Sequence, residues 1–169
     1  MRTLALRLHF FLLYAVAGAY LPYAPVFLAE DLGMPDWQIG WVTGCYGFAV
    51  LLAPPLLAAL ADRRVSGRSL MAAGYGLSAL ALVAFAEVDG FLPAVALAVA
   101  YGLAYTPLTS LLDGLVFAEL ARERAAGRGP PRYSALRVWG SVGFMAPALG
   151  LFAVMRWGLM GGRAAILAA

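Results

Sequence analysis

The sequence contains no lysine, and it has one histidine and one cysteine among its 169 residues. The single thiol, Cys45, excludes an internal disulfide and a cysteine-based metal site. The single histidine, His9, has no plausible catalytic partner at helical spacing. We therefore expect a protein that is not an enzyme and that has no catalytic residue, metal or cofactor.

Charge is also scarce, because only 12% of the residues are charged whereas 63% are hydrophobic. The apolar runs are long enough to cross a bilayer, which takes roughly 20 residues of helix. This composition predicts an all-α integral membrane protein in the lipid bilayer, and we expect no nucleic-acid partner.

The apolar runs are bounded by charges or turn residues, and five of them are long enough to be full spans. We expect these spans at about 8–29, 39–61, 69–87, 91–117 and 136–156, with an incomplete sixth at 163–169. The first run is longer than a signal-peptide core and further spans follow it, so we interpret it as a membrane helix.

The arginines gather in alternate connections, which indicates the orientation of the chain. Nine lie on one side: Arg2, Arg7, Arg63, Arg64, Arg68, Arg122, Arg124, Arg128 and Arg132. The other side holds mostly acids and only Arg156 and Arg163. We expect the N-terminus in the cytoplasm and the first and third loops outside.

Glycine and proline are frequent within the predicted spans. Gly40 and Gly44 have the spacing of a close helix contact, so we expect a packing face there. Pro22 and Pro25 in the first span predict a kink, since proline interrupts the helical hydrogen bonds.

Two charges stand alone within apolar stretches, Asp113 and Arg137. A charge at hydrocarbon depth costs a few kcal/mol, so such residues usually face a partner or an aqueous cavity. Both lie near the cytoplasmic ends of spans that we expect to be antiparallel neighbours, so their depths match. They predict either a substrate site or a structural ion pair that joins the two helices.

Three segments resemble the major facilitator superfamily, in the branch of the lactose and phenylpropionic acid permeases. They are FFLLY with GAYLPYAP in residues 10–25, ADRRVSGR in residues 61–68, and YSALRVWGSVGF in residues 133–144. The resemblance implies that residues 1–169 are an amino-terminal transmembrane domain. This would be the six-helix half of a twelve-helix bundle, with the sixth helix truncated.

The resemblance also implies roles for individual residues. Asp113 and Arg137 would bind substrate, Phe144 would stack on it, and Tyr20 and Tyr23 are weaker candidates. The segment with Asp62, Arg63, Gly67 and Arg68 would be a gating loop. The alternatives are that Phe144 only packs against other side chains, and that the loop is solvated and its arginines only set the orientation of the chain in the membrane.

By this resemblance the complete protein would transport a sugar, a nucleoside or an aromatic acid by alternating access, coupled to an ion or proton. It would lie in the bacterial inner membrane. This chain would be one half or a fragment, and its partner would be a carboxy-terminal six-helix half. The alternative is a membrane scaffold or partner subunit that does not transport.

Overall fold

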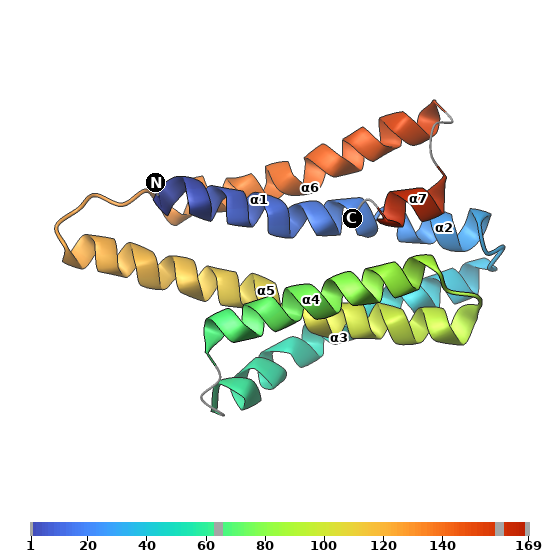
Figure 1. The fold of residues 1–169 in the computed structure, drawn as a ribbon, viewed down its shortest axis with the longest axis horizontal. Helices are drawn as coiled ribbons and strands as arrows, with labels where there is room; N and C mark the ends of the chain where they lie inside the picture. Colours follow the sequence, from blue (N-terminus) through green and yellow to red (C-terminus); the bar gives the residue numbers. More distant parts are fainter. Residues whose placement is uncertain (1, 63–65, 158–160, 168–169) are drawn as a thin grey trace.

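The computed structural model describes residues 2–62, 66–157 and 161–167, and these form helices joined by short connections, with no strand among them (Figure 1). The helices are α1 (Arg2–Tyr20), α2 (Ala24–Glu30), α3 (Asp36–Asp62), α4 (Gly67–Ala86), α5 (Phe91–Ala125), α6 (Tyr133–Arg156) and α7 (Gly162–Leu167). The predicted all-helical fold is confirmed.

The first predicted span is two helices, because the chain turns at residues 21–23 between α1 and α2. Pro25 lies in the first turn of α2, where its missing N–H leaves no helical bond unmade. A helix continuing from α1 would need that N–H, so the chain breaks before it. The helix also begins at Arg2, six residues before the expected start of the span.

α5 runs to Ala125, eight residues beyond the expected end of the fourth span. Gly127 ends it with a φ of 70°, a left-handed conformation that suits glycine. The amide of Gly127 donates to the carbonyl of Arg124, and that of Arg128 donates to the carbonyl of Glu123. The last charged turns of α5 therefore extend beyond the apolar stretch as a capped helix.

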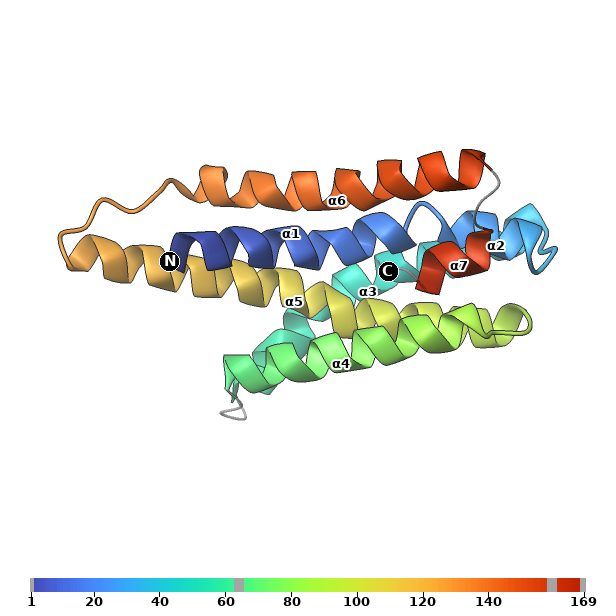
Figure 2. The ribbon, with the colours of Figure 1, turned by 45° about the horizontal axis from the view of Figure 1, so that its top comes forward.

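The helices form two groups, with α1 paired to α6 and α3 and α4 packed on α5 (Figure 2). α7 lies against α2 and α4. The spans of Asp113 and Arg137 were expected to be antiparallel neighbours, and they contact each other only near the start of α6. α6 lies along α1 and makes few contacts with α5.

Glycines explain this pairing of α1 with α6. A Cβ atom on Gly18 would overlap the main chain of Phe144, and one on Gly143 would overlap the main chain of Phe11. The two backbones therefore approach as closely as glycine allows, as in other small-residue contacts between membrane helices.

The contact face expected at Gly40 and Gly44 is not formed within the part of the chain that the structure describes. A Cβ atom at either position would meet no atom within 4 Å. α3 packs on α5 through its other face, where Ala49 lies so near Gly102 that a Cβ on the glycine would be 2.5 Å away.

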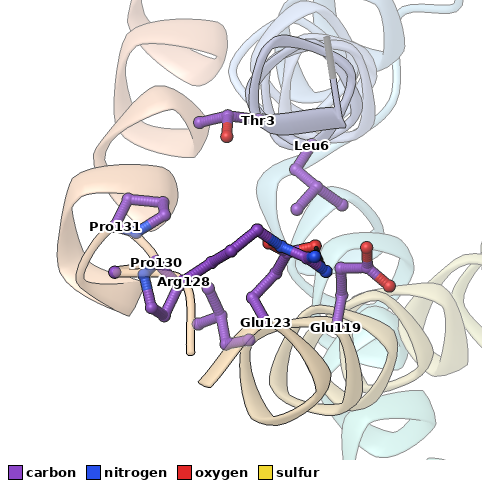
Figure 3. Close-up of a pocket in the computed structure, with 9 residues that line it drawn as sticks. Thr3, Leu6, Glu119, Glu123, Arg128, Pro130 and Pro131 are labelled. Atoms are coloured by element: carbon purple, nitrogen blue, oxygen red, sulfur yellow. Dashed lines mark hydrogen bonds and ion pairs between the residues drawn. The ribbon is translucent and has the colours of Figure 1, made fainter. Parts of the chain in front are cut away.

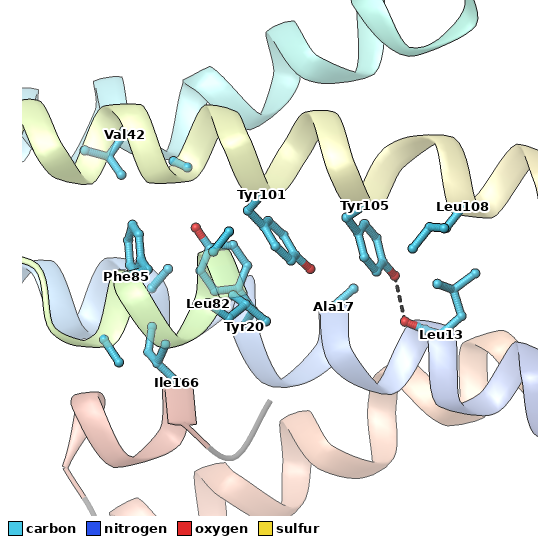
Figure 4. Packing of buried hydrophobic residues seen from close by; sticks show 14 of the residues in the cluster. Leu13, Ala17, Tyr20, Val42, Leu82, Phe85, Tyr101, Tyr105, Leu108 and Ile166 are labelled. Carbon is cyan, nitrogen blue, oxygen red and sulfur yellow. Dashed lines mark hydrogen bonds between the residues drawn. The ribbon is translucent and has the colours of Figure 1, made fainter. Parts of the chain in front are cut away.

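The buried core lies where α1, α4 and α5 meet (Figure 4). The ring of Tyr101 lies 4.6 Å from that of Tyr20 and 5.2 Å from that of Tyr105, centroid to centroid. Tyr105 donates a hydrogen bond of 2.7 Å to the carbonyl of Leu13, which ties α5 to α1 inside the core.

Within the described residues, four segments are long and apolar enough to cross a membrane. They are Thr3–Glu30, Gly67–Ala86, Phe91–Ala125 and Tyr133–Arg156. The chain is a multi-pass membrane protein.

Candidate functional site

Arg137 lies in the second turn of α6, partly buried against two aromatic rings of α1. Its Cζ is 4.3 Å from the ring centroid of Tyr14 and 5.7 Å from that of Phe10. A guanidinium over an aromatic face is attracted by the negative ring face, which partly replaces its lost hydration. Gly140 makes this position possible, since a Cβ there would lie 2.8 Å from Nη1 of Arg137.

A cavity of about 290 Å³ opens beside this guanidinium. Its lining residues are Tyr14, Arg137, Ser141, Phe144 and Met145. Two of the predicted site residues, Arg137 and Phe144, thus line the same cavity. Ser141 and Tyr14 were not predicted as site residues, although Ser141 lies one helical turn after Arg137 and its spacing could have indicated it.

Asp113 has a different partner. The hydroxyl of Tyr133, the first residue of α6, donates a hydrogen bond of 2.8 Å to Oδ1 of Asp113. The structure shows no ion pair between Asp113 and Arg137, both of which it describes. Asp113 is not among the residues that line the cavity, and the direct ion pair between α5 and α6 is not formed.

Two predicted tyrosines lie apart from the cavity. Tyr20 is buried in the core against Tyr101 and Phe85. Tyr23 donates a hydrogen bond to the carbonyl of Ala148 and so joins the turn after α1 to α6. Both contacts are structural, and a substrate role for either residue remains a prediction.

The predicted gating loop is described only in part. Arg63 and the side chain of Asp62 lie outside the described residues. Gly67 is the first residue of α4, and Arg68 follows it with an exposed side chain. Arg68 lines a shallow pocket with Glu119 and Arg122 at the end of α5, so a gating role remains a prediction.

A second pocket, of about 380 Å³, lies at the same end of the molecule (Figure 3). Arg128 reaches back across it to Glu123, with Nη2 3.0 Å from Oε1. This hydrogen bonding raises the pKa of the Arg128 guanidinium above its usual value. Glu119 likewise pairs with Arg122 at 3.0 Å. Because these charges already bind one another, we place the candidate site at Arg137.

Comparison with known proteins gives this geometry a context. Residues 3–158 match the MFS_1 like family. The chain is 27% identical over 148 residues to a maltose permease of Geobacillus stearothermophilus. The aligned region covers 88% of this chain and 36% of the permease. It is 29% identical over 148 residues to the putative nucleoside transporter YegT of Escherichia coli strain K12, covering 87% of the chain and 33% of the transporter.

The fold matches a crystal structure of the nucleoside transporter NupG with a TM-score of 0.83 and 22% identity, over 98% of this chain and 40% of that one. The chain thus spans about a third of the length of the curated relatives that it matches. Since the family match extends over nearly all of the sequence, the chain belongs to the MFS_1 like family of the major facilitator superfamily.

Proposed function

We propose that this chain forms the amino-terminal half of a transporter for a nucleoside or a sugar, and that Arg137, Ser141 and Phe144 are its contribution to the substrate site. One observation supports this proposal above the others. A partly buried guanidinium, paired with none of the acids that the structure describes, lines a cavity beside a hydroxyl and an aromatic ring. A charge in a membrane helix that faces a cavity is commonly functional.

The chemistry of the cavity suits such solutes. The planar guanidinium of Arg137 offers several donors to the hydroxyls of a sugar or to a base carbonyl. Ser141 can donate or accept one further bond. The ring of Phe144 offers an apolar face to a sugar ring or a base, and a few polar groups in an apolar cavity are typical of small-molecule sites.

Transport would need a second set of helices. In transporters of this superfamily, substrate binds near the bilayer midplane between two halves that rock against one another. The relatives are longer than this chain, which supports a carboxy-terminal six-helix half as its partner. We propose alternating access in the complete protein, coupled to an ion or proton, with the N-terminus in the cytoplasm.

The test is uptake by cells that express the complete protein containing this chain. Radiolabelled uridine, adenosine, maltose and phenylpropionate would be compared in wild type, Arg137→Gln and the control Arg156→Gln, which changes an exposed arginine at the end of the same helix. The proposal expects one solute to accumulate in wild type and in the control, and little of it in Arg137→Gln at equal membrane abundance. Equal uptake by Arg137→Gln would overturn the site assignment. Uptake of phenylpropionate alone, or of no solute above empty cells, would overturn the proposed substrate class.

A further inference from the structure

The acid and the arginine of this region both contact aromatic side chains, with no direct ion pair between them. Arg137 lies over Tyr14 and Phe10 of α1, whereas Asp113 accepts the hydroxyl of Tyr133. The ring of Tyr133 also contacts Phe10 edge-on, with the centroids 6.3 Å apart. The side chain of Tyr133 also hydrogen-bonds with Arg137, so its hydroxyl links the carboxylate on one side to the guanidinium on the other.

The hydroxyl of Tyr133 is fixed in direction by its surroundings. Its ring stacks on Phe117, four residues after Asp113 on α5, at 4.5 Å between centroids and 19° between planes. It is also the first residue of α6, so the helix start fixes its backbone. This ring supplies one of the few links between α5 and α6, and its hydroxyl meets the carboxylate from a defined side.

Without that hydrogen bond the two charges would attract one another. A carboxylate and a guanidinium interact strongly where the effective dielectric constant is low, and Arg–carboxylate pairs readily become bidentate. Such a pair would occupy the donors of Arg137 and cancel its charge. A substrate would then have to displace Asp113 before it could bind the guanidinium.

We propose that Tyr133 is a positioning residue that holds Asp113 away from Arg137 and so keeps the guanidinium available to substrate. The inference rests on the proposed role of Arg137 in substrate binding. On this inference Arg137 contacts the substrate and Asp113 does not. Tyr133 and Asp113 only keep Arg137 available for binding.

The experiment uses the complete protein in membranes and compares wild type, Tyr133→Phe and Tyr133→Phe with Asp113→Asn. The matched control is Tyr75→Phe, which removes a hydroxyl from a tyrosine of α4 outside this region. The first measurement is the rate at which phenylglyoxal modifies Arg137, followed by peptide mass spectrometry. The second is the half-saturation constant for uptake of uridine or maltose.

We expect Tyr133→Phe to slow modification of Arg137 and to raise the half-saturation constant about tenfold, the effect of losing one charge-assisted hydrogen bond. Adding Asp113→Asn should restore both values, since asparagine cannot form the ion pair. If Tyr133→Phe leaves the modification rate and the half-saturation constant unchanged, the inference is overturned. It is also overturned if Tyr133→Phe changes them and the added Asp113→Asn does not bring them back to the wild-type values. If the modification rates follow the expected pattern but neither solute is transported, the positioning role stands and the proposed substrate class fails.

Discussion

Gly18 of α1 lies directly against the main chain of Phe144 in α6, with no room for a Cβ atom between them. Because α6 makes few contacts with α5, this crossing with α1 fixes where the cavity residues of α6 lie. Replacing Gly18 with alanine should force the two helices apart. We expect a loss of about 1–3 kcal/mol of stability, the usual cost of overpacking.

The measurement is the thermal unfolding of the complete protein in detergent, compared for wild type and Gly18→Ala. Gly76→Ala is the control, since a Cβ on Gly76 in α4 would meet no atom within 4 Å. A melting temperature for Gly18→Ala no lower than that of the control would mean that the crossing is looser than described.

Gly140 should affect the site more than the fold. A Cβ at this position would lie 2.8 Å from Nη1 of Arg137 and 2.9 Å from Cδ2 of Tyr14, so Gly140→Ala must displace the guanidinium from the ring. We expect a raised half-saturation constant for uptake. Gly150→Ala, later in the same helix and with open space around it, should transport as wild type does. Identical kinetics in the two variants would count against the described position of Arg137.

Tyr105 should contribute a modest amount to stability. Its hydroxyl bonds the carbonyl of Leu13 in a buried contact between α5 and α1. Tyr105→Phe removes this bond while keeping the ring, so we expect a loss of roughly 0.5–1.5 kcal/mol. Chemical unfolding in mixed micelles measures it. A loss of several kcal/mol would instead indicate that the hydroxyl has a further role.

The orientation can be tested with single cysteines introduced after Cys45, which is buried, has been changed to serine. With the N-terminus in the cytoplasm, Asp89→Cys faces outward and Arg128→Cys faces the cytoplasm. A membrane-impermeant maleimide added to intact cells should label the first and not the second. The reverse pattern would invert the proposed topology.

The sequence predicted the helical membrane fold because long apolar runs admit few other structures. It also predicted Arg137, since a lone charge in such a run is conspicuous, and the family resemblance pointed to Phe144. Both residues line the cavity. Pro25 signalled an interruption of the first span, although not a complete turn with separate helices on either side.

Which helices pack against one another could not be predicted from the sequence. Small residues at Gly40 and Gly44 resembled a contact face, yet the close crossing uses Gly18 and Gly143, because spacing does not say which helix will face which. Tyr133 was missed as a site residue for a related reason. A tyrosine at a helix start is unremarkable until folding brings it to Asp113, 20 residues earlier in the chain.

The most direct test of the account is the binding of substrate to the purified complete protein. Tritiated uridine, or whichever solute the uptake experiment identifies, would be titrated against wild type, Arg137→Lys, Phe144→Ala and the control Phe152→Ala, whose ring is 56% exposed on the same helix. Lysine keeps the charge but loses the planar fork of donors, so we predict that Arg137→Lys and Phe144→Ala each weaken binding about tenfold or more. Binding by both variants as tight as that of the control would contradict the assignment of this cavity as the substrate site.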